Sequence, residues 1–220
     1  MLKKIKSRFV KYFVYKFFVI KKYIKYESPK ILDIGAGNHS ATRTKEVFPN
    51  CEYHGVDRDK DYSNSDSDLK KMDYFYEMDL QKLDFQAIPD NYFDVIIIAH
   101  VIEHLKNGDT VIEKLTEKLS PNGIIYVEWP SIRSIKLPSK RGTLNFFDDI
   151  THVKLYSLEE ICNICLSKNL TFLEGGIRRS KRLIFLIPVK MLDQKLRKGY
   201  VEAETFWDLL GFADYCVFRK

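Results

Sequence analysis

A short glycine turn between an apolar run and a helix-like stretch constrains the fold of this chain most strongly. Residues 31–37 read Ile-Leu-Asp-Ile-Gly-Ala-Gly, so the apolar run ends at Gly35 and Gly37. A second apolar run ends at Asp57. Glycines at such a turn let the backbone approach a ligand closely, and the acid can accept hydrogen bonds from ribose hydroxyls. This layout predicts a nucleoside-binding β-α-β unit.

The charges around the turn indicate which nucleoside it binds. Asp33 precedes Gly35 by two residues, and Ser40 stands where a dinucleotide fingerprint has a third small residue. A carboxylate at this place would repel a pyrophosphate but would attract an ammonium group, directly or through water. S-adenosylmethionine carries an ammonium group and no phosphate. We therefore expect S-adenosylmethionine as the cofactor, with the binding residues Asp33, Gly35, Gly37 and Asp57.

Further motifs follow in an order that resembles the class I S-adenosylmethionine-dependent methyltransferases. They are Glu77-Met78-Asp79-Leu80, Phe93–Leu105 and Leu119–Glu128, and the resemblance covers about residues 28–177. The family usually has two glycines after the proline of the last motif, whereas only Gly123 is present here. The resemblance implies that Asp79 lies near the adenine. It also implies that the stretch beginning at His100 lines the site, and we include His100 among the cofactor residues.

Apolar runs alternate with helix-like stretches along the whole chain. This alternation predicts an α/β fold, a Rossmann-like sheet of seven mostly parallel strands with helices on both faces. The last strand is expected to be antiparallel. Strands are expected at 30–34, 52–57, 75–79, 94–99, 124–129, 170–175 and 213–219, and helices at 40–48, 107–119, 158–168 and 203–211. The segment 58–69 is predicted to be a solvated loop, and 182–189 fits either a strand or a helix.

Residues 1–27 are predicted to form a basic amphipathic N-terminal helix, and residues 28–220 the methyltransferase domain. Apolar residues recur every three or four positions between 2 and 24, with lysines near the opposite face. Such a helix can lie on an anionic membrane surface, or it can pack on the core or on a partner. Within the domain, residues 130–156 lack a clear period and are expected to form an active-site loop or lid.

Composition limits the partners of the chain. The formal net charge is +6, and nine lysines and arginines precede the first acid, Glu27. Beyond that segment the charge is near balance, so nucleic acid is not an expected partner. Cys162 and Cys165 have no second ligand pair, which favours two small residues on one helix face over a zinc site. No cleavable signal or bilayer-spanning stretch is evident, so we expect a cytoplasmic location, with peripheral contact at the inner membrane face as the alternative.

The stretch Asn145–Val153 packs an amide, two acids and a histidine together. It resembles an Asp-x-Thr-His-Val segment of bacterial methyltransferases associated with surface polysaccharides. Transfer of a methyl group to a hydroxyl requires alignment of the acceptor and removal of a proton. We expect His152 to be the base and Asp149 to orient its ring. Two alternatives stay open: these residues only pin the lid, or Asp148, Asp149 and His152 bind a divalent ion. We assign no metal.

The function predicted from these features is O-methylation of a sugar or another small cell-envelope precursor. The basic N-terminus suits a phosphorylated or nucleotide-linked acceptor. A small-molecule O- or N-methyltransferase of quinone or phosphoramidate type is the alternative within the same class. A methyltransferase-like partner subunit without catalysis is the alternative outside it, and the intact residues Asp33, Gly35, Gly37 and Asp57 argue against that possibility.

Overall fold

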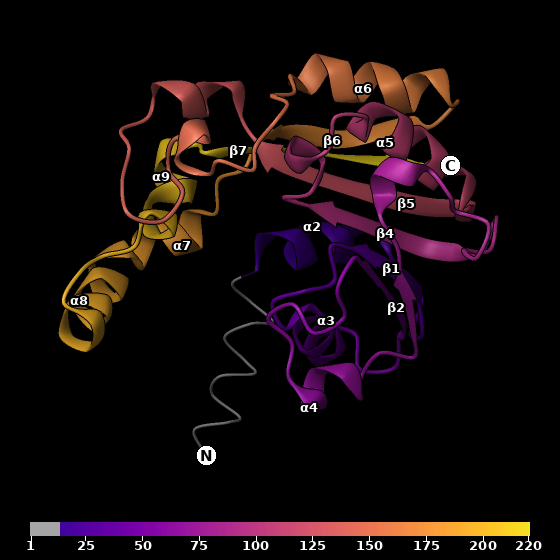
Figure 1. Ribbon diagram of the computed structural model, residues 1–220, viewed down its shortest axis with the longest axis horizontal. Coiled ribbons are helices and arrows are strands. Elements are labelled where there is room, and N and C mark those ends of the chain that lie inside the picture. Colours follow the sequence, from indigo (N-terminus) through magenta and orange to yellow (C-terminus); the bar gives the residue numbers. More distant parts are fainter. Residues whose placement is uncertain (1–13) are drawn as a thin grey trace.

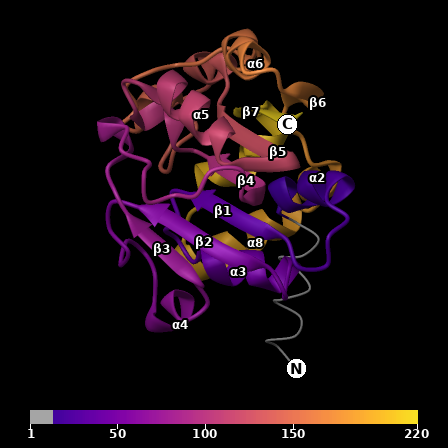
Figure 2. The ribbon, with the colours of Figure 1, turned by 90° about the vertical axis from the view of Figure 1, so that its right-hand side faces the viewer.

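The computed structural model describes residues 14–220, which are built around a seven-stranded sheet (Figures 1 and 2). Its strands are β1 (Lys30–Ile34), β2 (Glu52–Asp57), β3 (Tyr74–Glu77), β4 (Phe93–Ala99), β5 (Leu119–Pro130), β6 (Thr171–Ile177) and β7 (Ala213–Arg219). Their order across the sheet is β3-β2-β1-β4-β5-β7-β6, and β7 runs antiparallel to both of its neighbours. The predicted fold class is therefore confirmed, including the direction of the last strand.

Helices cover both faces of the sheet. Those in the described chain are α2 (Tyr15–Tyr23), α3 (Ser40–Val47), α4 (Asp66–Leu69), α5 (Gly108–Glu117), α6 (Leu158–Ser167), α7 (Lys181–Phe185), α8 (Ile187–Lys198) and α9 (Trp207–Leu210). Short 3-10 turns are η1 (Leu80–Lys82), η2 (Ile102–His104), η3 (Ile132–Lys136), η4 (Phe146–Asp148) and η5 (Ala203–Phe206). Helices α5 and α6 lie on one face and α2 and α3 on the other, while α7, α8 and α9 extend beyond one end of the sheet (Figure 1).

The central strands are buried on both faces, which explains their continuous apolar sequence. In β4, Val95 and Ile97 pack in the cluster that contains α2 and α3 residues, whereas Ile96 and Ile98 pack in the cluster of α5 and α6. All four side chains are fully buried. Side chains of a strand alternate between its two faces, so a strand between two helical layers needs apolar residues at every position.

The order of the strands indicates at which edge of the sheet a ligand can bind. Strand β1 pairs with β2 on one side and with β4 on the other, so the strand order reverses between β1 and β4. Ligands of open α/β sheets bind outside the carboxyl ends of the strands at such a reversal. Gly35, Asp57 and Ala99 end or directly follow these three strands. The fold therefore brings the motifs of the sequence to one edge of the sheet.

Helix α2 contains the described part of the predicted N-terminal helix. Its residues Phe17, Val19 and Ile20 are fully buried in the same core as the sheet. On its outer side, Lys22 pairs with Glu174 at 3.0 Å. This part of the helix packs its apolar face on the core of the chain itself. That is one of the arrangements that the sequence leaves open for the predicted N-terminal helix. The remaining apolar positions of the predicted helix, up to residue 13, lie outside the described residues.

The predicted solvated loop at 58–69 is wrong in its second half. This half contains the short helix α4, and Asp68 within it is buried. The hydroxyls of Ser65 and Thr42 donate hydrogen bonds to its carboxylate, and the His39 ring lies 2.6 Å from it. Burial alone would raise the pKa of Asp68, but these hydrogen bonds outweigh burial and lower it. Most of the segment 58–69 is exposed to solvent, as its polar composition predicts, and Asp68 is the buried exception.

Three other boundaries differ from the sequence prediction. The helix expected at 107–119 ends at Glu117, and Pro121 lies inside β5, where residues 120–123 drop out of the pairing with β4. Because the ladder is interrupted there, the missing N–H of proline costs no sheet hydrogen bond. The ambiguous segment 182–189 is helical in α7 and α8. Asp79 lies beyond β3 and caps η1 by accepting a hydrogen bond from the Gln81 amide at 3.0 Å.

Candidate active site

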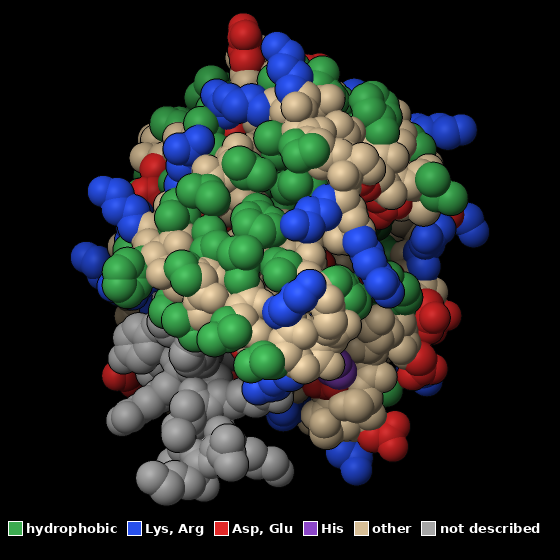
Figure 3. All heavy atoms as spheres, turned by 90° about the vertical axis from the view of Figure 1, so that its left-hand side faces the viewer, with side chains coloured by type: hydrophobic (Ala, Val, Ile, Leu, Met, Phe, Trp, Pro, Cys, Tyr) green, Lys and Arg blue, Asp and Glu red, His purple; other side chains and the backbone are tan. Residues whose placement is uncertain are grey.

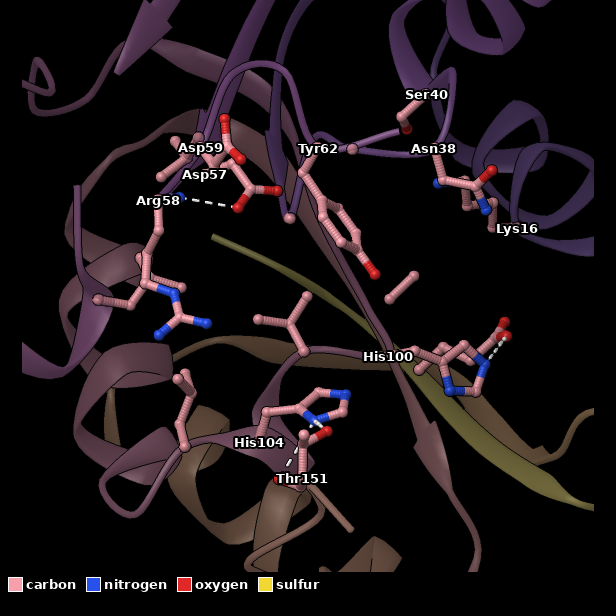
Figure 4. A pocket seen from close by; sticks show the side chains of 18 of the residues that line it. Lys16, Asn38, Ser40, Asp57, Arg58, Asp59, Tyr62, His100, His104 and Thr151 are labelled. Atoms are coloured by element: carbon pink, nitrogen blue, oxygen red, sulfur yellow. Dashed lines mark hydrogen bonds and ion pairs between the residues drawn. The ribbon is translucent and has the colours of Figure 1, made fainter. Parts of the chain in front are cut away.

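A cavity of about 1250 Å³ opens at the carboxyl ends of β1, β2 and β4 (Figure 4). Five of the six predicted cofactor residues line it: Gly35, Gly37, Asp57, Asp79 and His100. Figure 4 shows Asp57 on one side and Asn38 and Ser40 on the other, with Tyr62 reaching between them. The structure thus brings together residues that are spread over 66 positions of the sequence, from 35 to 100.

A side chain at either of the two glycines would collide with a neighbouring residue of the chain. Gly35 has a φ of +75°, and a Cβ there would lie 2.6 Å from the Cγ2 atom of Val101. A Cβ on Gly37 would lie 2.7 Å from the Cδ1 atom of Tyr62. The amide of Gly35 donates to the Val56 carbonyl at 2.8 Å, which fixes the turn to the neighbouring strand. Both glycines present bare backbone to the cavity, and the close approach of a nucleoside to this turn stays a prediction.

The acids at the cavity wall are held by the backbone next to them. Asp57 accepts a hydrogen bond from the Arg58 amide at 2.7 Å through its Oδ1 atom. Asp79 is fixed as the cap of η1. A carboxylate has two oxygens and several acceptor positions, so each acid keeps acceptors for a ligand. This geometry fits the ribose and adenine contacts that were expected of Asp57 and Asp79.

Asp33 is the predicted cofactor residue that the cavity wall does not include. Its side chain is buried and accepts hydrogen bonds from the hydroxyls of Ser40 and Tyr53, the latter at 2.9 Å. Ser40 does line the cavity and so offers Asp33 an indirect contact with a ligand. The contact of Asp33 with a ligand ammonium group, directly or through water, stays a prediction. Its partner Tyr53 comes from β2, which the local sequence around Asp33 does not reveal.

His100 is held between two carboxylates. Its Nε2 atom lies 3.0 Å from Glu128 Oε1, and its Nδ1 atom lies 3.2 Å from Glu103 Oε1. Burial alone would lower the pKa of His100, but hydrogen bonds to Glu103 and Glu128 outweigh burial and raise the pKa to about 9. The ring is therefore cationic at neutral pH and donates both of its N–H groups. It shapes and charges the wall but has no free nitrogen to take up a proton.

A buried ion-pair network extends this part of the wall. Arg178 donates from Nη1 to Glu128 Oε1 at 2.8 Å and from Nη2 to Asp208 Oδ2 at 2.9 Å. Burial alone would raise the pKa of Glu128, whereas the charges of Arg178 and His100 hold it below its usual value. Sequence reasoning missed these residues. Glu128 carried a signal, because an acid inside an apolar strand requires a buried partner.

The predicted catalytic pair lies outside the cavity wall. The side chain of His152 is 5% exposed and lies against His104, with ring centroids 4.8 Å apart and ring planes tilted by 54°. His104 and Thr151 do line the cavity. Asp149 faces a second, smaller cavity of about 480 Å³ and accepts hydrogen bonds from Thr151. The assignment of His152 and Asp149 to catalysis stays a prediction, and from this position His152 reaches the cavity only through His104.

The metal alternative of Asp148, Asp149 and His152 stays a prediction, and the structure shows what Asp148 does without an ion. Asp148 accepts hydrogen bonds from the Leu144 and Asn145 amides at 2.9 and 2.8 Å and so closes the η4 turn. The group of potential ligands that the described residues do contain is Glu103, His104 and His152. Their ligand atoms lie within 4.8 Å of one another. The sequence placed Glu103 and His104 in a separate motif, so their approach to His152 was not visible.

Comparisons with known proteins show the family and the fold of the chain. The Methyltransferase domain family matches residues 8–174. A curated relative, a probable polyketide synthase 8/35 of Dictyostelium discoideum, is 27% identical over 126 residues, which are 50% of this chain but 5% of that protein. The chain therefore spans a small fraction of that relative's length.

Solved structures share the fold. A SAM-dependent methyltransferase from Archaeoglobus fulgidus superposes with a TM-score of 0.59 at 20% identity, over 97% of this chain and 94% of that one. Phosphoethanolamine N-methyltransferase 2 of Haemonchus contortus, in complex with S-adenosyl-L-methionine, gives 0.65 at 14% identity, over 93% of this chain and 51% of that one. The family match covers well over half of the chain, and the glycine turn and acids line one cavity. The chain therefore belongs to the methyltransferase-domain family, and its fold is shared with S-adenosylmethionine-dependent methyltransferases.

Proposed function

We propose that the chain methylates a hydroxyl of a small anionic acceptor, a phosphorylated or nucleotide-linked sugar or another cell-envelope precursor. The observation that carries this proposal is a set of cations in the cavity wall. Lys16, Arg43 and Arg58 line the cavity, and none of them forms an ion pair within residues 14–220. Phosphate is the ligand that such side chains bind best, through charge-assisted hydrogen bonds.

The residues of the chain divide the work of binding and orientation. Bound S-adenosylmethionine supplies a methyl group on a positively charged sulfur that leaves readily. The bare backbone at Gly35 and Gly37 admits the nucleoside, and Asp57 accepts hydrogen bonds from its ribose. Holding acceptor and cofactor in the reacting geometry within one cavity is a large contribution that an enzyme makes to such a displacement.

The loop at 130–156 supports the acceptor assignment. It contributes Thr151 to the cavity wall, which also includes Glu204 and Trp207 from the segment that holds η5 and α9. Trp207 donates from Nε1 to the Thr143 carbonyl at 2.5 Å, which ties this loop to α9. The resemblance of Asn145–Val153 to polysaccharide-associated methyltransferases concerns the same loop. We propose that it covers the acceptor as a lid.

Mass spectrometry of reaction products tests the acceptor. The full chain is incubated with S-adenosylmethionine and a panel of nucleotide sugars and envelope phosphates, beside neutral quinols and amines. We expect one added methyl group on an anionic acceptor. Arg58→Gln should raise the KM for that acceptor, whereas the surface variant Arg197→Gln should not. Methylation of only quinols or amines would favour the alternative methyltransferase class. Cofactor binding without any turnover would favour the non-catalytic partner subunit.

We also propose that the molecule contacts an anionic membrane surface through α7 and α8. The apolar side chains Phe185, Val189, Leu192 and Leu196 are 61–82% exposed, and their spacing of four, three and four places them on one side. Exposed cations surround them: Lys181, Arg182, Lys190, Lys195, Arg197 and Lys198. Figure 3 shows hydrophobic side chains gathered among lysines and arginines on this side of the molecule.

An interfacial helix on an anionic bilayer has this combination of an apolar stripe and flanking cations. None of the helices within residues 14–220 is long and apolar enough to cross a membrane. The contact is thus proposed to be peripheral. Cosedimentation with vesicles of anionic lipid, beside vesicles of neutral lipid, tests it.

A further inference from the structure

Three side chains at the edge of the cofactor cavity are arranged as metal ligands. Glu103 and His104 lie on the η2 turn that follows β4, and His152 comes from the predicted lid. One ligand atom of each lies within 4.8 Å of the other two. His104 is part of the cavity wall, while Glu103 and His152 stand behind it. The group therefore lies where an ion could touch both the protein and a bound acceptor.

The carboxylate of Glu103 has an oxygen without a partner. The residue is 1% exposed, and its Oε1 atom is taken by His100. Its Oε2 atom has no hydrogen-bond partner among the described residues. A buried charged oxygen is unfavourable unless a donor or a cation satisfies it. This atom points to a ligand that carries positive charge.

The hydrogen bonds of both histidines are made by Nδ1, and Nε2 of each has none, although His152 Nε2 lies 3.9 Å from Asp149 Oδ2. The Nδ1 atom of His152 lies 2.6 Å from the Phe146 carbonyl oxygen, which can only accept, so Nδ1 carries the proton. The Nδ1 atom of His104 lies 2.9 Å from Thr151 Oγ1. Because Thr151 donates its own proton to Asp149 at 2.6 Å, its oxygen accepts from His104.

Both rings therefore keep the lone pair on Nε2. Metal-binding histidines have this arrangement, with the second ring nitrogen donating to a carbonyl or to a group held by a carboxylate. Asp149 and Thr151 thereby gain a positioning role, because they set the ring state of His104.

We propose that Glu103, His104 and His152 bind a divalent first-row transition ion. Two imidazoles and one carboxylate suit such an ion, and three protein ligands leave a position open for a substrate atom. Bonds of about 2.1 Å place two ligands no more than about 4.2 Å apart, so binding draws the side chains together by about half an ångström. Small rotations of His104, at the cavity wall, can supply this change.

The open position gives the ion a use that rests on the proposed O-methylation. The ion binds the acceptor hydroxyl oxygen and lowers its pKa, so its proton leaves to solvent. The oxygen then forms a bond to the methyl carbon as the carbon–sulfur bond breaks, and the sulfur keeps the electron pair of that bond.

Titration with Co²⁺ tests the site without cofactor or acceptor. The chelator-treated full chain is titrated by calorimetry and by visible absorption. We expect one equivalent to bind with visible bands of a nitrogen-coordinated ion. Glu103→Gln, His104→Ala and His152→Ala should each weaken binding by about tenfold or more, and Thr151→Val should weaken it less. His39→Ala is the matched control, because His39 pairs with Asp68 at 2.6 Å on the far side of the glycine turn.

Two results would overturn the site. One is folded wild-type protein that binds no Co²⁺, which would make the three residues a hydrogen-bonded brace. The other is binding that survives in His104→Ala and His152→Ala, which would place the ion elsewhere. If Glu103→Gln does not fold, Thr151→Val still tests the site. Thr151 is exposed, so its replacement should leave the fold intact. Failure of this titration leaves the acceptor proposal standing, because the acceptor panel depends on product mass alone.

Discussion

Asp57 and Asp61 offer a matched pair of carboxylates near the cavity. Asp57 lines the wall, whereas Asp61 lies four residues further along in the exposed turn and does not. Asp57→Ala removes the acceptors proposed for the ribose hydroxyls and should weaken S-adenosylmethionine binding by about 1–3 kcal/mol. Asp61→Ala should leave the affinity near that of the wild type. Calorimetry measures both, and an unchanged affinity of Asp57→Ala would remove this residue from the cofactor site.

His100 makes stability depend on pH. Its pKa is about 9 in the folded chain, against about 6.5 for an unperturbed histidine. Its contribution to the free energy of unfolding is therefore fully present below about pH 6.5 and is lost as the pH rises through about 9. The wild type should lose up to about 3 kcal/mol across this window. Urea unfolding at several pH values measures the free energy of unfolding, and in His100→Gln this free energy should change less with pH across the window. If it fell with pH as steeply as in the wild type, other groups would cause the pH dependence.

Single residues were predictable where their signal was local. Gly35, Gly37 and Asp57 follow apolar runs directly, and a few neighbouring residues are enough to recognise their role. Arg178 and Trp207 reach the cavity from segments more than a hundred residues away from the glycine turn, and no short motif marks them. The partners of a buried side chain come from the whole fold, which a single sequence does not display.

At the scale of elements, the turn after β1 depends on glycine for two separate reasons. Gly35 has a positive φ, and a Cβ there would collide with Val101. Gly199 at the end of α8 has a similar φ of +78°, but a Cβ there would meet no heavy atom within 4 Å, so this position isolates the backbone cost. Gly199→Ala should lower the free energy of unfolding by about 1 kcal/mol, and Gly35→Ala by more.

Denaturant unfolding of the two glycine variants measures this difference. The double variant Gly35→Ala with Val101→Ala should recover the part that comes from the collision, leaving the backbone part. Cofactor affinity should fall in Gly35→Ala, measured on the folded protein. Equal losses at Gly35 and Gly199 would mean that Val101 moves aside without cost.

Strands were easier to predict than the segments between them. A parallel strand buried on both faces is a continuous apolar run with sharp ends, as in β1 and β4. The segment 182–189 also contains an apolar run, from Leu183 to Ile187, but it divides into the helices α7 and α8, of which the first has only five residues. Phe185 and Val189 are exposed whereas Ile187 is buried, so an apolar pattern does not mark the core along this whole segment.

The whole molecule presents cations and apolar side chains together on the side where α7 and α8 lie (Figure 3). Helix α8 packs on η5, whose residue Glu204 lines the cavity. A surface contact through α8 would therefore act close to the wall of the active site. This link connects the proposed membrane contact with an acceptor from the cell envelope.

Paired leucine variants test that contact in the full chain. Leu192→Asp with Leu196→Asp places two acids in the exposed stripe and should reduce cosedimentation with anionic vesicles about fivefold or more. Leu166→Asp on α6 is the control, because Leu166 is 50% exposed but lies on another surface. Added salt should weaken binding of the wild type, since screening removes the attraction of the cations. Equal binding to neutral vesicles would contradict the electrostatic part. Unchanged binding of the double variant would exclude α8, and the predicted N-terminal helix would then be the segment to test.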